Sequence, residues 1–356
     1  MADLANINAL TKRHSEPTRL RLLRSDCQLS FVSCARENLA IESSGSTRFK
    51  IMKITITCLA LTVMQLSGYS QPVKETQTPE APASASAGVP VAVQPAGPPY
   101  QLADTETFEL ASPETGNTYN IVVAFPGDYA WAPAGKTYPV IYVIDAQWQF
   151  PLIYTVAGAV NYDGAMPPVL LVGISWKPTN GNLMALRDQD MTPTAKSRPN
   201  YGHAKKFQDF LRHTLFPRIE SHYRANQHRT VTGCSTSSLF VFYTLLSQPD
   251  LFEGYIGSSP PLAWDNYAMN SILDKFPQDG IKQNTRAYMT CGALENSSVW
   301  SDFTNQLGRK NLKNLSFSFA PVSNAGHAGE NAECYTRGLQ FVFATNVPPK
   351  SGPGTQ

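Results

Sequence analysis

The sequence predicts one α/β domain over residues 100–347, in which helices cover both faces of a mostly parallel sheet that begins with an antiparallel hairpin. Short apolar runs rich in β-branched and aromatic residues alternate with helical patterns along this region. Such alternation is typical of parallel strands joined by crossover helices. Hydrophobic residues make up 42% of the 356 residues and charged residues 16%, which is enough apolar material for a sizeable core.

The predicted hairpin lies at the start of the domain. Its two β-rich runs, 107–112 and 118–126, flank the sequence Pro-Glu-Thr-Gly-Asn. Proline, glycine and asparagine favour tight turns, each through its own backbone preference. We therefore expect the two runs to pair as antiparallel strands.

Six later runs are predicted to form the rest of the sheet. Two of them, 138–146 and 167–176, are almost wholly apolar, as strands buried on both faces are. The other four runs span residues 229–234, 254–260, 286–292 and 315–321.

Three helical patterns separate these runs. Residues 204–224 carry one apolar stripe at spacings of three and four, and we expect Pro217 to perturb this helix locally. Residues 237–249 predict a buried helix and residues 299–311 an amphipathic one. The stripe of the first helix consists of Phe207, Phe210, Leu211, Leu215 and Ile219.

Residues 176–203 are interpreted as a loop whose aromatic and charged side chains could line the entrance to a site. Loops on a rigid scaffold often carry binding residues, so we expect substrate choice to depend on this segment. Arg187 and Asp188 lie within it, and a structural ion pair is favoured over a contact with substrate.

The segments outside the domain have their own signatures. Residues 52–70 place a lysine before a short apolar run that ends in small residues, which is typical of a secretory signal peptide; the alternative is a core helix or strand. This interpretation makes Met52 the initiator, residues 1–51 an over-long start, and the location periplasmic or secreted. Residues 71–99 and 348–356 are rich in Pro, Gly and small residues and predict a disordered linker and tail.

Charge and cysteine content exclude several classes of protein. The net charge is +2 and the basic residues are scattered, so nothing favours a nucleic-acid partner. The domain cysteines, Cys234, Cys291 and Cys334, have no disulfide framework and no zinc spacing. Buried free thiols are favoured, with a Cys291–Cys334 disulfide as the alternative. We expect no metal, no cofactor and no stable membrane span in the mature form.

The strongest functional signal is the sequence Val-Thr-Gly-Cys-Ser-Thr-Ser-Ser, residues 231–238. It follows the pattern of a strand, a tight turn and a helix, and Gly-x-Ser-x-Gly at such a turn is the nucleophile elbow of α/β-hydrolases. Gly233 and Ser235 match this pattern, whereas Ser237 replaces the second glycine. Ser235 is therefore the predicted nucleophile. The alternative is a serine-rich cap before the following helix.

A base and an acid follow in the order that α/β-hydrolases use, which is serine, acid, histidine. His327 is the one histidine after Ser235 and lies in a glycine-rich loop behind the last predicted strand. An imidazole can take a serine proton near neutral pH. Glu295 directly follows the strand 286–292 and is predicted to orient the imidazole, with Asp302 as the alternative acid.

An oxyanion hole needs two backbone N–H groups. One is predicted to come from Thr236, the residue after the nucleophile, and the other from Gln147, at the end of the strand 138–146. Both donors belong to the backbone, so the side chains at these positions are not decisive.

Several segments in this order resemble the putative esterase family of α/β-hydrolases, which includes enterochelin-esterase-like hydrolases and esterase D. The resemblance covers about residues 105–345 and is most specific over 229–266. It implies a serine nucleophile and no cofactor, with Ser235 and His327 in the catalytic roles and Glu295 at the usual place of the acid. The segments are YPVIYVIDAQWQF, LRDQDMTPT, FQDFLRHTLFPRIESHYR, RTVTGCSTSSLFVFYTLLSQPDLFEGYIGSSPPLAWDN and GALE.

The elbow departs from the usual family sequence, which commonly reads Gly-His-Ser-x-Gly-Gly. We expect the side chains of Ser237 and Ser238 to tighten or displace the turn. Some family members need little help from an acid, which leaves open that Glu295 is dispensable.

Together these residues predict an exported serine hydrolase that cleaves a carboxylic ester through an acyl-enzyme at Ser235. The expected substrate is a small-molecule or glycan-linked ester. Two alternatives remain open: acyl transfer to a sugar or lipid at the same site, and a degenerate hydrolase fold that only binds.

Overall fold

The computed structural model describes residues 97–98, 100–178, 182–195, 198, 200–296 and 298–344. All the elements below belong to the compact unit Val91–Gln356. The predicted start extension, signal peptide and tail lie outside the described residues, as does the predicted linker apart from residues 97 and 98.

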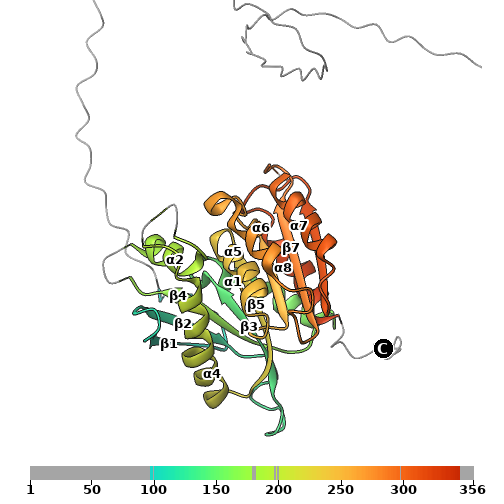
Figure 1. Ribbon diagram of the computed structural model, residues 1–356. Coiled ribbons are helices and arrows are strands. Elements are labelled where there is room, and N and C mark those ends of the chain that lie inside the picture. The colour runs from blue at the N-terminus through green and yellow to red at the C-terminus, as the bar shows by residue number, and fades with distance from the viewer. Residues whose placement is uncertain are drawn as a thin grey trace, which may run out of the picture. The chain divides into compact units, whose positions relative to one another are not determined.

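One eight-stranded sheet forms the centre of this unit, with the strand order β1-β2-β4-β3-β5-β6-β7-β8 (Figure 1). β2 pairs antiparallel with both β1 and β4, and all other neighbours are parallel. The predicted hairpin and mostly parallel sheet are therefore confirmed. The strands are β1 (Thr105–Ala111), β2 (Thr118–Ala124), β3 (Tyr138–Ile144), β4 (Leu170–Trp176), β5 (Ala225–Cys234), β6 (Gly254–Ser258), β7 (Thr285–Gly292) and β8 (Leu315–Val322).

Helices cover both faces of the sheet (Figure 1). On one face, α1 (Ala146–Tyr162) and α8 (Asn331–Phe343) pack against each other and against strands β3, β4, β6 and β7. The other face buries a larger core, to which α5 contributes most of its side chains. The helices of that face are α2 (Leu183–Met191), α3 (Ala204–Phe210), α4 (Phe216–His222), α5 (Thr236–Ser247), α6 (Trp264–Lys275) and α7 (Ser298–Lys310).

The long helix predicted over residues 204–224 forms, but with an irregular middle. A π-helical turn, Leu211–Leu215, separates α3 from α4, and the N–H of Phe216 donates to the carbonyl of Leu211. Pro217 explains the change, because its ring excludes a regular bond one turn back and it has no N–H to donate. All five residues of the predicted stripe are buried, so the amphipathic pattern is confirmed.

The interpretation of residues 176–203 as a loop is wrong in part, because α2 lies within it. Asn182 caps this helix by accepting a hydrogen bond from the N–H of Ala185. The buried face of α2 includes Arg187 and Asp190. A helix that buries charged side chains has no apolar stripe, which is why periodicity did not reveal it.

The cysteines Cys234, Cys291 and Cys334 are free and buried, as expected. No helix within the described ranges is both long and apolar enough to cross a membrane.

Candidate active site

Ser235 lies at a sharp turn between β5 and α5. Its backbone angles are φ 59° and ψ −124°, a combination that residues other than glycine seldom adopt and that therefore indicates strain. The turn is held on both sides, since Ser235 N–H donates to Ser258 O at 2.9 Å and Leu239 N–H donates to Ser235 O at 3.0 Å. A Cβ atom on Gly233 would lie 2.6 Å from the backbone of Ser237, so glycine is required there. The backbone thus forms the strand–turn–helix elbow that the sequence predicts.

Ser237 and Ser238, which we expected to tighten or displace the turn, are both buried beside the elbow and each has a defined place there. Ser237 is fully buried and its Oγ donates to Asp145 Oδ2 at 2.6 Å. Ser238 Oγ faces Gly257 in β6, where an added Cβ would lie 2.3 Å from that oxygen. The missing side chain at residue 257 makes room for the hydroxymethyl group at residue 238.

A buried ion pair lies next to the elbow. Arg187 Nε and Nη2 donate to the two carboxylate oxygens of Asp145 at 2.7 and 2.8 Å, and both side chains are almost fully buried. Arg187 Nη2 also donates to the carbonyl of Cys234 at 3.1 Å. Burial alone would lower the pKa of the guanidinium, but its hydrogen bonds and attraction to Asp145 raise the pKa overall. The structural interpretation of Arg187 is confirmed, with Asp145 as its main partner and Asp188 as a weaker one.

The predicted oxyanion donors lie at the starts of two neighbouring helices. Thr236 is the first residue of α5 and Gln147 the second residue of α1, and these helices follow β5 and β3, which pair in the sheet. In the described structure, no hydrogen bond involves the backbone N–H of either residue. Such N–H groups at helix starts have no partner within the helix and carry partial positive charge.

The structure brings Glu295 and His327 together. Glu295 Oε2 lies 2.8 Å from His327 Nδ1, and the imidazole is half exposed whereas the carboxylate is mostly buried. Burial pushes the pKa of Glu295 up, but hydrogen bonds from Ser259, His327 and the N–H of Gly292 lower it overall. Asp302 points from the exposed side of α7, so the imidazole has Glu295 rather than Asp302 as its carboxylate partner.

The backbone fixes this pair through close packing of two loops. Ala293 N–H donates to Val322 O at 2.9 Å, and Leu294 N–H donates to Ala325 O at 3.0 Å. A Cβ atom on Gly292 would lie 2.5 Å from Ala325 O. The loop that carries Glu295 is therefore joined directly to the loop that carries His327.

A short series of contacts connects this pair with the elbow. Ser235 N–H bonds to Ser258, and the next residue, Ser259, donates its hydroxyl to Glu295 Oε1 at 2.5 Å. Within the described part of the chain, no hydrogen bond joins Ser235 Oγ to His327. Catalytic hydrogen bonds are often long in enzymes without substrate and tighten in the complex.

Sequence reasoning missed Ser259 and Glu330. Ser259 is 1% exposed and Glu330 0% exposed, and their side chains are hydrogen-bonded to each other. Glu330 follows His327 by three residues, and this proximity in the sequence was the one available signal. Ser259 has no motif of its own, because its role depends on a contact across the sheet.

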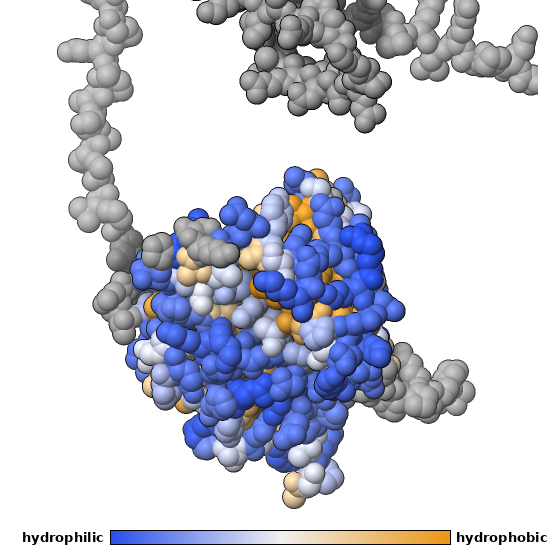
Figure 2. All heavy atoms as spheres, in the orientation of Figure 1, coloured by the Kyte–Doolittle hydropathy of each residue, from blue (hydrophilic) through white to orange (hydrophobic). Residues whose placement is uncertain are grey.

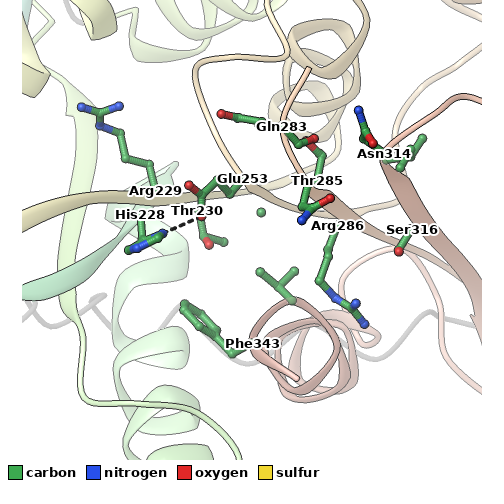
Figure 3. Close-up of a pocket in the computed structure, with 14 residues that line it drawn as sticks. His228, Arg229, Thr230, Glu253, Gln283, Thr285, Arg286, Asn314, Ser316 and Phe343 are labelled. Atoms are coloured by element: carbon green, nitrogen blue, oxygen red, sulfur yellow. Dashed lines mark hydrogen bonds and ion pairs between the residues drawn. The ribbon is translucent and has the colours of Figure 1, made fainter. Parts of the chain in front are cut away.

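A pocket of about 650 Å³ lies at the opposite edge of the sheet, where β5, β6, β7 and β8 begin. Figure 3 shows its polar lining, with a hydrogen bond of 2.7 Å between His228 and Glu253. The side chains of Arg229 and Arg286 extend away from each other on two sides of it. Ligands of parallel sheets usually bind at the carboxyl ends of the strands, which is the edge where Ser235 lies and not the edge of this pocket.

Two curated relatives are similar to the chain over much of its length. It is 29% identical over 275 residues to the ferri-bacillibactin esterase BesA of Bacillus subtilis, covering 70% of this chain and 93% of that protein. It is 27% identical over 178 residues to the siderophore triacetylfusarinine C esterase of Aspergillus fumigatus, covering 47% of this chain and 59% of that protein.

A solved structure and a family model agree with these matches. The fold resembles that of an IroE-like serine hydrolase from Shewanella oneidensis, with a TM-score of 0.61 and 23% identity over 69% of this chain and 82% of that one. The family model described as "Putative esterase" matches residues 112–311, more than half of the chain. The predicted resemblance is confirmed: the chain belongs to the putative esterase family of α/β-hydrolases and is a hydrolase that acts on esters.

Proposed function

We propose that this protein hydrolyses a carboxylic ester through an acyl-enzyme formed on Ser235. The observation that carries the proposal is the elbow at Ser235, on the same sheet edge as the hydrogen-bonded pair of Glu295 and His327. A nucleophile, a base and a group that orients the base are the components that acyl transfer requires.

In the proposed reaction Ser235 Oγ bonds to the carbonyl carbon of the ester while His327 accepts the proton of the Ser235 hydroxyl. The resulting oxyanion is stabilised by the backbone N–H groups of Thr236 and Gln147; one such donor is typically worth about 10²–10³-fold in turnover. Collapse breaks the bond to the alcohol, which leaves with the proton from His327. Water then attacks the acyl-enzyme and gives a proton to His327, and the second collapse releases the carboxylic acid and returns the proton to Ser235. Throughout, Glu295 keeps Nδ1 of His327 protonated, so that the other ring nitrogen exchanges protons.

We further propose that the substrate is an ester-linked siderophore. The two curated relatives, whose names say that they act on ferri-bacillibactin and on triacetylfusarinine C, support this class.

The surface around the site also favours a large ligand with aromatic or charged groups. Trp148, Tyr267 and Leu294 lie in or just after the segments that leave β3, β6 and β7 at their carboxyl ends, and they are 51%, 49% and 74% exposed. On the side seen in Figure 2, hydrophobic residues gather in the region where Figure 1 places α5 to α8, within a mostly hydrophilic surface. Exposed apolar groups of this kind often mark binding sites.

A second cluster extends this surface. Tyr201 stacks on Trp264 with ring centroids 5.9 Å apart, and the guanidinium of Arg198 lies 5.5 Å from the Trp264 ring. Rings combined with a delocalised cation suit an aromatic, anionic ligand.

Export through a signal peptide at residues 52–70 remains part of the proposal. Peptide mapping of the protein from the culture medium and periplasm tests it, because a mature protein that begins after residue 70 supports export. Peptides from residues 1–50 would contradict the proposed start at Met52.

A panel of esters tests the function directly. Nitrophenyl acetate, a feruloyl ester, acetylated xylan and a ferric siderophore lactone are offered to the wild type and to Ser235→Ala. We expect hydrolysis of the siderophore by the wild type and a loss of about 10⁴–10⁶-fold in kcat for the variant. Labelling of Ser235 by a fluorophosphonate separates an active enzyme from a protein that only binds. Full activity of Ser235→Ala would refute the assigned nucleophile.

A further inference from the structure

The hydroxyl of Ser259 lies between two carboxyl groups. Its Oγ is 2.5 Å from Glu295 Oε1 and is also hydrogen-bonded to Glu330 Oε1. Both Ser259 and Glu330 are buried away from solvent. A serine hydroxyl has one proton to donate, so it cannot donate to two carboxylates at once. One of the two hydrogen bonds therefore needs a proton from the carboxyl side.

The surroundings of the two carboxyl groups decide which of them supplies that proton. Glu295 accepts hydrogen bonds from the N–H of Gly292 at 3.0 Å and from His327. Among the described residues, the donors beside Glu330 are the hydroxyl groups of Ser259 and Thr290, and no backbone N–H or cation is hydrogen-bonded to its carboxyl group. A buried carboxyl group without a cation or enough donors is more stable in its neutral form.

We propose that Glu330 is a positioning residue that carries a proton and donates it in a hydrogen bond to Ser259 Oγ, so that Ser259 donates to Glu295 and Glu295 accepts from His327 Nδ1. In this series each hydrogen bond has one donor and one acceptor. It rests on the proposed function, because its purpose is to hold the carboxylate that orients the catalytic imidazole. Glu330 itself does not touch the reacting atoms.

The electrostatic surroundings of Glu330 agree with this assignment. Burial is the largest effect and raises its pKa; hydrogen bonds from Ser259 and Thr290 oppose it, and the negative charge of Glu295 adds a smaller rise, so that the pKa is raised overall. Burial also raises the pKa of every thiol and phenol that faces Glu330, so these groups stay neutral with it. They are Cys234, Cys291, Cys334 and Tyr335, with the pKa of Cys291 raised to about 12.

This arrangement predicts how activity depends on pH. Once Glu330 loses its proton, Ser259 faces two carboxylates and donates to only one of them. Because the two carboxylates then compete for this one proton, Glu295 loses its donor for part of the time and the imidazole is held less firmly. Activity should therefore decline on the alkaline side as Glu330 ionises.

The experiment compares Glu330→Gln with Glu330→Ala in the full chain. The glutamine amide can still donate to Ser259 but cannot ionise, whereas alanine removes the donor. We expect Glu330→Ala to lower kcat about tenfold with little change in KM, as the loss of one hydrogen bond would. Glu330→Gln should retain more activity than the alanine variant and should lose the alkaline decline. Glu333→Gln, on the exposed side of α8, which begins directly after Glu330, is the matched control and should leave the pH profile unchanged.

A second pair of variants tests whether Ser259 transmits the effect. In a Ser259→Ala background, Glu330→Gln should no longer alter the pH profile, because the link to Glu295 is already broken. An alteration of equal size in both backgrounds would contradict the proposed route.

Infrared spectroscopy reads the proton without any need for activity. The difference spectrum of wild type minus Glu330→Gln at pH 7 should contain the C=O stretch of a protonated carboxylic acid. Absence of this band, or an alkaline decline that persists unchanged in Glu330→Gln, would overturn the proposal. A wild type that hydrolyses no ester but shows the band would refute the proposed function and leave the proton on Glu330.

Discussion

Two buried carboxyl groups lie beside the candidate site, and different partners stabilise them. Asp145 is 1% exposed and forms two hydrogen bonds with Arg187 and one with Ser237. Glu330 is 0% exposed, and in the described structure the donors beside its carboxyl group are hydroxyl groups, those of Ser259 and Thr290. Two carboxyl groups that are equally buried therefore need not carry the same charge, because a buried carboxyl group stays ionised only where cations or several hydrogen-bond donors replace water.

The difference divides the site into two halves. The half around Asp145 joins the β3–α1 loop, α2 and the elbow by fixed charges, which suits the positioning of a nucleophile and oxyanion donors. The half around Glu330 joins β6, the β7–α7 loop and α8 by hydrogen bonds that depend on one proton. We expect the first half to respond strongly to loss of a partner and the second half to respond to pH.

The largest expected effect is that of Arg187→Met. The variant leaves Asp145 buried without its cation and should lower the free energy of unfolding by about 3–5 kcal/mol, measured by denaturant titration. Arg337→Met removes an exposed partner of Glu333 on α8 and should leave stability unchanged within error. An Arg187→Met protein as stable as this control would break the comparison, because Asp145 would then not need its cation.

A smaller effect is expected for the hydroxyl at the elbow. Ser237→Ala removes a donor to a buried carboxylate and should cost about 1.5–3 kcal/mol of unfolding free energy. Ser238→Ala is the matched control, since Ser238 Oγ is buried without a hydrogen-bond partner and its removal should cost little. Equal losses for both variants would show that packing, and not the bond to Asp145, explains the effect.

The smallest expected effect is a pH dependence of folding stability that comes from Glu330. In the unfolded chain a glutamate releases its proton near pH 4.3, whereas the raised pKa of Glu330 keeps the proton in the folded state. Wild-type stability should therefore fall relative to Glu330→Gln as pH rises from about 4.3 to the folded-state pKa of Glu330, by at most about 1.4 kcal/mol per pH unit. Unfolding at several pH values measures this difference. A difference that does not vary with pH would mean that the fold does not raise the pKa of Glu330.

The sign is opposite for Glu295, whose pKa is lowered in the fold. Its contribution to stability is present above the unfolded value and is lost as pH falls through the lowered folded value. Ionisation of Glu330 therefore lowers the folding stability as pH rises, and protonation of Glu295 lowers it as pH falls, although the same serine contacts both glutamates.

Local patterns in the sequence were sufficient for much of the fold. The apolar runs became β3 and β4, and the turn residues between 112 and 118 became the hairpin of β1 and β2, because these signals depend on neighbours in the chain. Helix α2 was missed since its buried residues include Arg187 and Asp190. Burial of such side chains depends on partners that a local pattern does not contain.

The amino-acid sequence by itself determined the eight strands, the helical segments near 204–224, 237–249 and 299–311, the glycine at 233 that the elbow needs, and the order of Ser235, Glu295 and His327. The tertiary structure alone decided which groups share a proton or a charge. Ser237 meets Asp145 across 92 positions and Ser259 meets Glu330 across 71. Hydrogen bonds act over about 3 Å in space, and no spacing along the chain reports that distance.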